Sequence, residues 1–255
     1  MSNSFGKIFR ITIFGASHAE SVGIIIEGAP KGIALSADMF RTDIDRRRPT
    51  LSGETARKEE DTPIIKGLNS DGKTTGEPIT VTFKNSDKRS GDYSHLRVHP
   101  RPSHADLVQL RKYGSDADIA GGGIASGRMT VALVAAGVVA KEILKGVNFT
   151  TRLASVNGIS DSTQFNDIIS RAAADGDSVG GVVECRIMGV REPLGEPFFD
   201  SAESVISHLL FSIPGVKGVE FGDGFIGTTK RGSERNDLII DSSGTTLTNN
   251  EGGIN

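Results

Sequence analysis

The stretch SGRMTVALVAAGVVAKEILK, residues 126–145, constrains the fold of this chain more than any other segment. Its middle is rich in alanine and valine and is apolar on nearly all sides, which predicts a helix that lies buried in the core. Ser126 is suited to cap the N-terminus of this helix. Lys141 and Lys145 suit its C-terminal end, where the helix dipole favours cations.

Strands are predicted on both sides of this helix. FGKIFRITIF (5–14) alternates apolar and polar residues, which is typical of a half-buried strand. VGIIIEG (22–28) is a short apolar run and predicts a second, more buried strand. PITVTF (78–83) predicts a third strand, and SVGGVVECRIMGV (178–190) predicts a strand interrupted by glycines.

Two further helices and two long loops complete the expected organisation. Residues 37–48 predict a short helix with a basic end, and residues 201–215 predict an amphipathic helix that ends at a Pro-Gly pair. The polar, turn-rich residues 49–76 are expected to form an exposed loop, and residues 84–103 a second long loop. The length of 255 residues fits one large domain or two small ones.

Composition narrows the classes of function. Lys and Arg number 29 against 32 Asp and Glu, and this balance argues against a general nucleic-acid binder. The N-terminus has no apolar signal segment, and no apolar run is long enough to cross a bilayer, so we expect a soluble cytoplasmic protein without a membrane partner. The one cysteine, Cys185, excludes an intramolecular disulfide, and its apolar neighbours predict a core position.

A serine and a histidine stand at a small-residue turn between the first two predicted strands. The turn reads GASHAE, Gly15 to Glu20. From the residues alone it is either a catalytic corner or a plain turn.

Two glycine-rich stretches could bind phosphate. GGGIASGR (121–128) leads into the buried helix, and free backbone N–H groups at a helix start can receive an anion, although such starts are also common as plain structure. GDGFIG (222–227) matches the dinucleotide-binding pattern literally. We reject that interpretation because the polar TTKRGSERND follows, whereas the mechanism requires a helix there.

Arginines and one histidine offer further candidates. RTDIDRRRP (41–49) contains Arg46, Arg47 and Arg48, which are either solvated charges or guanidinium groups aimed at a phosphate or carboxylate. PRPSHAD (100–106) holds His104 in a rigid backbone, which suits an acid–base group, although a lone histidine is often structural. The sequence shows no metal-ligand spacing and no nucleophile elbow, so we expect no metal site.

The order of these segments resembles a known family. FGKIFRITIFGASHAESVGIIIEGAP resembles the N-terminal signature of the chorismate synthase family. Further motifs then follow in that family's order and spacing, and the resemblance covers essentially the whole chain: DIDRRRP, TTGEPITV, DYS, PRPSHAD, KYG, GGGIASGRMTVALVAAGVVAKEIL, SVGGVVE, LGEP, SIPGVKGVEFGDGF and GSERND.

The resemblance implies a fold and a reaction. The fold would be of the α+β class, a β-α-β sandwich, with residues 1–255 forming one domain that is incomplete at its C-terminus, assembled as a homotetramer. The reaction would be the 1,4-elimination of phosphate from 5-enolpyruvylshikimate-3-phosphate to give chorismate, the last step of the shikimate pathway. It would require reduced FMN without net redox change. NADPH would enter only if a flavin reductase activity is built in.

The resemblance also assigns roles to residues. His18 and His104 would be catalytic: His104 would assist phosphate departure, and His18 would keep the reduced flavin in its working protonation state. Four residues would contact the cofactor and two arginines the substrate phosphate: Ser17, Arg47, Ala125 and Ser126 for the cofactor, and Arg101 and Arg128 for the substrate.

Several positions depart from the family pattern. Ala16 replaces the usual glutamate of the turn, Ala19 a glycine, Ala120 an arginine, and Ile124 an arginine or histidine. The family also continues beyond the position of Asn255 into a segment with an Arg-His-Asp motif. Two hypotheses follow: an enzyme of this family, or a catalytically impaired or inactive relative that retains at most anion, flavin or subunit binding.

Overall fold

The computed structural model describes residues 3–49, 57–87, 90–190 and 193–254. They fold into two compact units, Met1–Val190 and Arg191–Asn255. The first unit contains the main core and all the segments that form the candidate site described below. The expectation of one domain over residues 1–255 stays a prediction.

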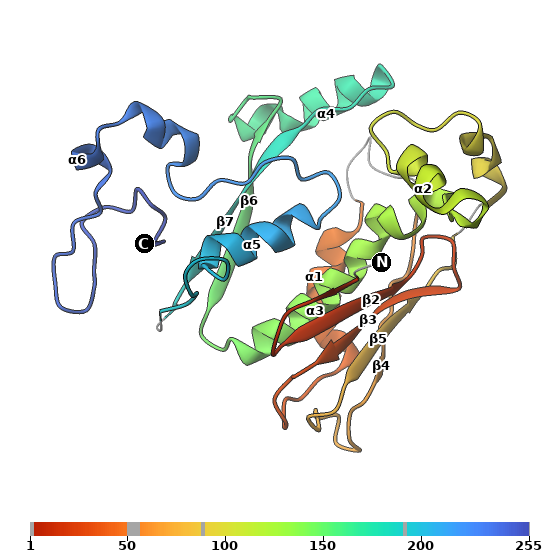
Figure 1. Ribbon diagram of the computed structural model, residues 1–255, viewed down its shortest axis with the longest axis horizontal. Helices are drawn as coiled ribbons and strands as arrows, with labels where there is room; N and C mark the ends of the chain where they lie inside the picture. Colours follow the sequence, from red (N-terminus) through yellow and green to blue (C-terminus); the bar gives the residue numbers. More distant parts are fainter. Residues whose placement is uncertain (1–2, 50–56, 88–89, 191–192, 255) are drawn as a thin grey trace. The chain divides into compact units, whose positions relative to one another are not determined.

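The first unit is built on a five-stranded antiparallel sheet (Figure 1). Its spatial order is β1-β2-β3-β5-β4, with β1 at Ser4–Phe5, β2 at Arg10–Gly15, β3 at Ser21–Glu27, β5 at Ile79–Lys84 and β4 at Ile64–Lys66. The central β3 is the most buried strand, as its apolar run predicts, since Val22, Ile24 and Ile26 have no exposed surface.

The β2–β3 hairpin places the GASHAE turn at the end of the sheet. Pairing between the two strands runs from Arg10–Glu27 to Gly15–Val22, so residues 16–20 form the connection. On its other side β3 pairs with β5 up to Ser21–Lys84, which brings the residue after β5 beneath the same turn. Strand register therefore decides which side chains meet at this corner.

Helix α3, Thr130–Ile143, confirms the buried helix expected from the alanine- and valine-rich stretch. Val131, Ala132, Ala135 and Val139 are fully buried in the core between the sheet and helix α1, Ala37–Arg47. The α-helix begins later than predicted, because Gly127–Met129 form a 3₁₀ turn, η4. Ser126 still acts as the cap, since its Oγ accepts a hydrogen bond from the Arg128 backbone N–H at 3.3 Å.

A second pair of strands follows the helix. β6, Asn148–Val156, pairs antiparallel with β7, Gly181–Met188, and the connection contains η5, Ser162–Gln164, and helix α4, Phe165–Ala174. In Figure 1 α1 and α3 lie between the five-stranded sheet and this ribbon, and Arg46 of α1 donates to Thr151 Oγ1 at 2.7 Å. The combination confirms the α+β class.

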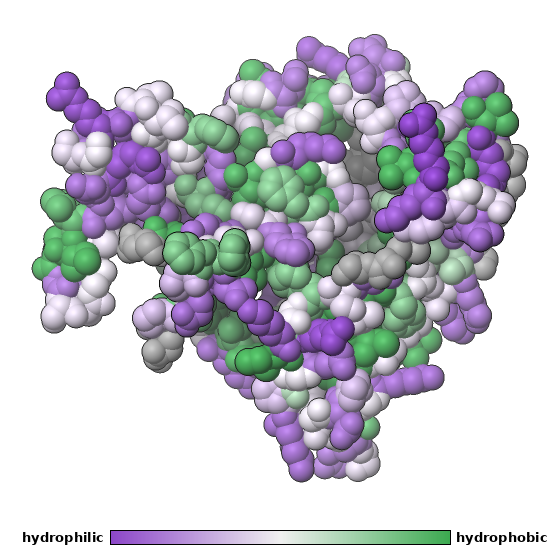
Figure 2. Space-filling model, viewed as in Figure 1, coloured by the Kyte–Doolittle hydropathy of each residue, from purple (hydrophilic) through white to green (hydrophobic). Residues whose placement is uncertain are grey.

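The predicted core position of Cys185 is wrong. Cys185 is exposed, as are its β7 neighbours Val182, Val183 and Met188. An apolar strand is buried only if another layer covers it, and β7 is exposed along nearly its whole length in a two-stranded ribbon. Figure 2 shows hydrophobic residues reaching the surface at several places on the face in view.

The two predicted loops contain more structure than expected. Within 49–76 the described residues include β4 and the buried side chains of Asp61 and Thr74, so that part of the prediction is wrong. The loop predicted at 84–103 contains the 3₁₀ helix η1, Ser90–Arg97. Helix α2, Asp106–Tyr113, and the 3₁₀ helices η2, Gly114–Asp116, and η3, Ala120–Ala125, follow it.

The second unit contains the predicted amphipathic helix and two short helical turns. Helix α5 runs over Ala202–Phe211, and Ser201 Oγ caps it by accepting from Ser204 N–H at 3.4 Å. GDGFIG enters the 3₁₀ helix η6, Gly224–Thr229, followed by α6, Gly232–Arg235. Across the described ranges, none of the helices has the length and apolar character needed to cross a membrane.

The packing of α1 against α3 predicts a large loss of stability when a buried side chain of α1 is truncated. Phe40 is fully buried, so Phe40→Ala should lower the free energy of unfolding by about 3–5 kcal/mol, the usual cost of such a cavity. Phe225 is 76% exposed and provides the matched control, since Phe225→Ala should change stability by less than about 0.5 kcal/mol. Urea unfolding followed by circular dichroism measures both, and equal losses would contradict the described core.

Candidate functional site

The structure brings the GASHAE turn and the triple glycine into contact. Ser17 N–H donates to the Gly123 carbonyl at 3.1 Å, and Ser17 is only 1% exposed. A Cβ added at Gly121 would lie 2.3 Å from His18 Cε1 and 2.5 Å from its Nδ1. The absence of a side chain at Gly121 therefore makes room for the imidazole of His18.

The glycines are required for a second reason. Gly121, Gly122 and Gly123 have φ of 57°, 85° and 55°, a conformation that other residues adopt only at a cost. The stretch was predicted as a glycine-rich start of the buried helix. It is instead a left-handed turn that wraps over His18 before the chain reaches α3.

An aromatic ring bounds the other side of the histidine. The centroids of the His18 and Tyr93 rings are 5.0 Å apart, with an interplanar angle of 72°, which is an edge-to-face contact. Tyr93 belongs to η1 and Gly121 to η3, so two separate helical turns enclose His18. The imidazole is partly buried.

Arg57 and Glu59 hold the GASHAE turn in place. The Arg57 guanidinium donates to Ser17 Oγ at 2.8 Å and to the Ser17 carbonyl at 2.9 Å. The same guanidinium pairs with Glu59 at 2.7 Å, and the Glu59 side chain is 5% exposed. Ser17 therefore accepts a charge-assisted pair of hydrogen bonds that fixes both its backbone and its hydroxyl.

Glu59 has a strongly shifted acidity. Burial would raise the pKa of its carboxyl, but hydrogen bonds from the Ser86 hydroxyl and N–H and from Arg57 outweigh burial and lower the pKa from 4.5 to about 2. The Ser86 hydroxyl and N–H lie 2.6 and 2.9 Å from Glu59 Oε2. The carboxylate therefore stays ionised at neutral pH.

Asp61 joins two of the predicted site arginines. Its carboxylate pairs with Arg128 through Oδ1 and with Arg47 through Oδ2, the latter at 3.4 Å. The side chains of Arg128 and Asp61 are 4% and 2% exposed, so this is a buried ion pair. Arg128 also donates from Nε to Asn85 Oδ1 at 2.9 Å and from Nη2 to the Lys84 carbonyl at 3.3 Å.

Arg47 lies at the edge of the same cluster. It donates to Thr130 Oγ1 at 3.1 Å and to the Gly127 carbonyl at 3.2 Å, which ties α1 to the start of α3. Burial lowers the pKa of the Arg47 guanidinium; Asp61 opposes this, while Arg128 and Arg57 add to it. Three arginines therefore share the carboxylates of Glu59 and Asp61.

Arg101 and His104 lie on the separate loop that precedes α2. Arg101 forms a two-pronged pair with Asp106 at 2.8 and 2.9 Å, and this hydrogen bonding lowers the pKa of Asp106 against the opposing effect of burial. His104 is exposed, and its Nδ1 lies 2.9 Å from the Pro102 carbonyl. The described side-chain contacts of Arg101 and His104 are local to this loop and the start of α2.

The remaining predicted cofactor residues, Ala125 and Ser126, follow the triple glycine. Ala125 is exposed at the end of η3, and Ser126 uses its hydroxyl as the cap of η4. Among the departures from the family pattern, Ile124 packs against the core cluster and Ala120 N–H donates to Asp118 Oδ1 at 3.2 Å. Ala16 and Ala19 both offer their carbonyl oxygens to the Asn85 side chain.

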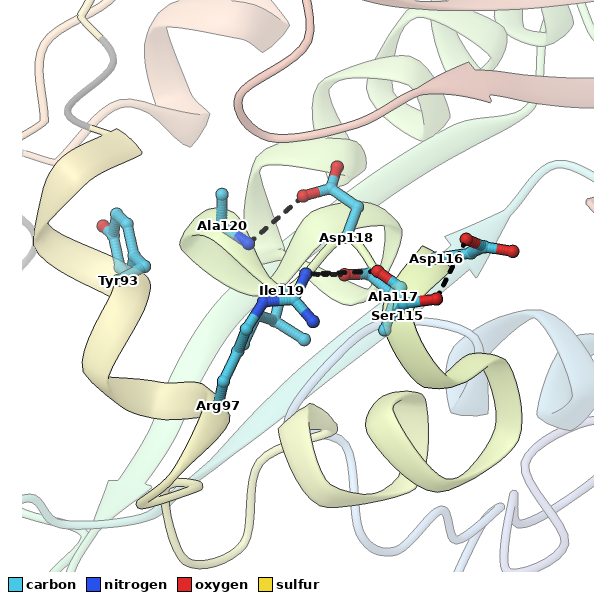
Figure 3. A pocket seen from close by; sticks show the side chains of 8 residues that line it. All are labelled: Tyr93, Arg97, Ser115, Asp116, Ala117, Asp118, Ile119 and Ala120. Carbon is cyan, nitrogen blue, oxygen red and sulfur yellow. Dashed lines mark hydrogen bonds between the residues drawn. The ribbon is translucent and has the colours of Figure 1, made fainter.

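A cavity of about 480 Å³ opens beside the His18 corner (Figure 3). Tyr93 and Arg97 of η1 line one side and the segment Ser115–Ala120 lines the other. Arg97 donates to the Ala117 carbonyl at 2.8 Å. Because Tyr93 contacts His18 and Ala120 precedes Gly121, this cavity adjoins the candidate site.

Sequence reasoning missed four residues of this site. Arg57, Glu59 and Asp61 come from a segment expected to be an exposed loop, and Asn85 stands alone after a strand. The string RKEED (57–61) offered a weak signal, because dense charge of both signs can form internal pairs as well as a solvated surface. In the described part of the chain no cluster of His, Cys, Asp and Glu is arranged to hold a metal ion.

The fold and the site define a protein of the α+β class whose polar centre is an arginine cluster beside a fixed histidine, an arrangement suited to an anionic small molecule. Comparison with known proteins identifies the family. A family model of chorismate synthase matches residues 9–255, and the chain belongs to the chorismate synthase family.

Relatives with that name match along essentially the whole chain. Chorismate synthase of Chitinophaga pinensis is 51% identical over 253 residues, which cover 99% of this chain and 75% of the relative. Chorismate synthase of Opitutus terrae is 39% identical over 285 residues, covering 100% and 78%. A crystal structure of a chorismate synthase superposes with a TM-score of 0.78 over 98% of this chain and 79% of that chain at 24% identity, which confirms the expected fold.

The pKa of Glu59 predicts a defined pH dependence of stability. A folded-state pKa of about 2 against 4.5 contributes stability that is complete above pH 4.5 and lost as the pH falls towards 2. Glu59→Gln should therefore lower the free energy of unfolding by about 3 kcal/mol at pH 7 and by about half of that at pH 3. Urea titrations at both pH values measure the difference. The neighbouring, exposed Glu60→Gln is the control, and a pH-independent effect of Glu59→Gln would contradict the assigned environment.

The glycine turn offers a matched pair of substitutions. Gly121→Ala and Gly122→Ala both add a methyl group at positive φ, each at a cost of about 1–2 kcal/mol. Only Gly121→Ala forces that methyl onto His18, since the Cβ at position 122 would lie 3.5 Å from its nearest neighbour, Ser126 Cβ. NMR of histidine-labelled protein should show the His18 ring resonances moved in Gly121→Ala and nearly unchanged in Gly122→Ala. Equal shifts would show that Gly121 does not adjoin the ring.

Proposed function

We propose that this chain catalyses the chorismate synthase reaction, with reduced FMN as cofactor. In the 1,4-elimination the C–O bond from 5-enolpyruvylshikimate-3-phosphate to its phosphate breaks, a C–H bond gives up its proton, and a new double bond forms. The observation that carries the proposal is the family match over residues 9–255, in a structure that encloses His18 between the glycine turn and Tyr93.

The charges of the corner fit both anionic molecules. Arg47, Arg57 and Arg128 gather with Glu59 and Asp61 in this corner. Guanidinium groups in a partly buried corner attract phosphate and carboxylate groups more strongly than exposed surface charges do. The residues present therefore fit the phosphate of the substrate and that of FMN.

The cofactor would lie against the glycine turn. We propose that Ser17, Arg47, Ala125 and Ser126 border it. Ala125 and Ser126 lie within residues 121–128, and Ser17 and Arg47 each form a hydrogen bond to this segment. Reduced FMN, when bound, would supply electron density to the substrate as phosphate leaves. His18, held between Gly121 and Tyr93, would keep a proton where the flavin requires it.

The substrate would meet the loop before α2. We propose that His104, as an imidazolium, donates its Nε2 proton to the departing phosphate, since its ring is exposed and its Nδ1–H faces the Pro102 carbonyl. Arg101 would contact the phosphate from the same loop, on which Asp106 fixes its orientation. Arg128 would contribute its positive charge from its buried position, because its described donors already form hydrogen bonds to Asp61, Asn85 and the Lys84 carbonyl.

The wider setting follows from the same proposal. The enzyme would be a carbon–oxygen lyase of aromatic biosynthesis that acts as a homotetramer in the cytoplasm. NADPH would be used only if the chain reduces its own flavin.

An anaerobic assay with chemically reduced FMN tests the proposal. The purified chain should release chorismate and phosphate from 5-enolpyruvylshikimate-3-phosphate. His18→Ala and His104→Ala should each lower kcat by about 10²–10⁴-fold, the usual loss of a positioned acid–base group. His99 is exposed and outside the described corner, so His99→Ala should retain full activity. A folded chain that binds FMN without turnover would contradict the proposal and favour an inactive relative.

A further inference from the structure

We infer that Asn85 is a positioning residue that fixes the catalytic turn and thereby the imidazole of His18. The structural part of this inference stands on geometry alone, and its kinetic part rests on the proposed function. Asn85 directly follows β5 and was not among the residues singled out from the sequence. Its side chain is the link between the turn and the buried ion pair of Arg128 and Asp61.

The amide of Asn85 holds the turn at both ends. Nδ2 donates one hydrogen to the Ala16 carbonyl at 3.0 Å and the other to the Ala19 carbonyl at 2.9 Å. The Asn85 backbone N–H donates to the Glu20 carbonyl at 3.0 Å, which extends the β3–β5 pairing by one step. The residue is 6% exposed, so water competes little with these bonds.

Arg128 fixes which way the amide faces. Its Nε donates to Asn85 Oδ1 at 2.9 Å, and Asp61 and the Lys84 carbonyl hold the rest of the guanidinium. A rotated amide would direct its NH₂ group at the guanidinium and its oxygen at two carbonyls, losing three hydrogen bonds. The buried ion pair therefore sets the direction in which Asn85 presents its two donors.

His18 is the residue whose side chain this clamp controls. Ser17 is already fixed by Gly123 and Arg57, and Asn85 fixes the carbonyls on either side of the Ser17–His18 pair. With the backbone held in this way, the imidazole occupies the space that a Cβ at Gly121 would otherwise fill. A displacement of about 1 Å at a catalytic group can cost about 100-fold in rate.

Asn85→Asp is the sharpest test. Aspartate keeps the shape of the side chain and the acceptor for Arg128, but it replaces both donors with an oxygen that faces two carbonyl oxygens. We expect kcat to fall by about 10–100-fold while KM for 5-enolpyruvylshikimate-3-phosphate changes by less than about threefold. The ring resonances of His18, assigned by their loss in His18→Gln, should move, and their pH titration should change.

Asn69→Asp is the matched control. Asn69 Oδ1 accepts from the backbone N–H groups of Asp71 and Lys73 at 3.0 and 2.8 Å in an exposed turn, and a carboxylate can accept in the same way. This variant makes the same charge change but keeps both described hydrogen bonds of the side chain, so kcat and the His18 resonances should match the wild type. Asn85→Ala removes the donors without adding charge, and it decides the question if Asn85→Asp fails to fold.

The outcomes separate this inference from the proposed function. The inference is supported if Asn85→Asp or Asn85→Ala moves the His18 resonances and lowers kcat while Asn69→Asp changes neither. Resonances and kcat equal to those of the wild type in a folded Asn85 variant would overturn it and leave the proposed function standing. A wild-type chain without turnover whose His18 resonances still respond to Asn85 would overturn the proposed function and leave the positioning role intact.

Discussion

The pairing of Arg128 with Asp61 is the interaction on which the candidate site depends. Both side chains are almost completely removed from water, and an isolated buried charge would cost several kcal/mol. The pair joins two segments far apart in the sequence, the stretch after Arg57 and the start of α3. Through Asn85, Arg128 also reaches the hairpin turn, so one buried cation links the parts of the site that carry chemistry.

The location of this pair follows from the way the core is built. α3 is buried because its middle is apolar, and its first turn therefore meets the end of the sheet rather than solvent. Arg128 stands at that turn, at the edge of the sheet where β3 begins and β5 ends. A cation placed there must find acceptors within the protein, and Asp61, Asn85 and the Lys84 carbonyl provide them. The stability of the core and the geometry of the site are consequently parts of one arrangement.

The pattern of apolar residues, alternating in β2 and continuous in β3 and α3, was enough to predict β2, β3, β5 and α3. The same reasoning did not predict β4 or β6, because Ile64–Lys66 is too short and Asn148–Val156 too polar to stand out. It misplaced Cys185 because an apolar strand is buried only when another layer covers it. Burial by a partner element is not encoded in the strand itself.

The residues of the candidate site were likewise predicted only in part. His18 and the triple glycine were found from local patterns, and the structure brings them into contact. Arg57, Glu59, Asp61 and Asn85 were missed, because their importance comes from pairing between segments rather than from any local motif. Ala16 and Ala19, which depart from the family pattern, act in this structure through their backbone carbonyls, which any residue supplies.

A double-mutant cycle between Asp61 and Asn85 tests the central claim most directly. No hydrogen bond between these two residues is described; both bind Arg128. The free energies of unfolding of Asp61→Asn, Asn85→Ala and the double variant give their coupling. If Arg128 joins them into one network, the coupling energy should lie within about 0.5–3 kcal/mol. Effects that add to within about 0.3 kcal/mol would contradict a network centred on this arginine.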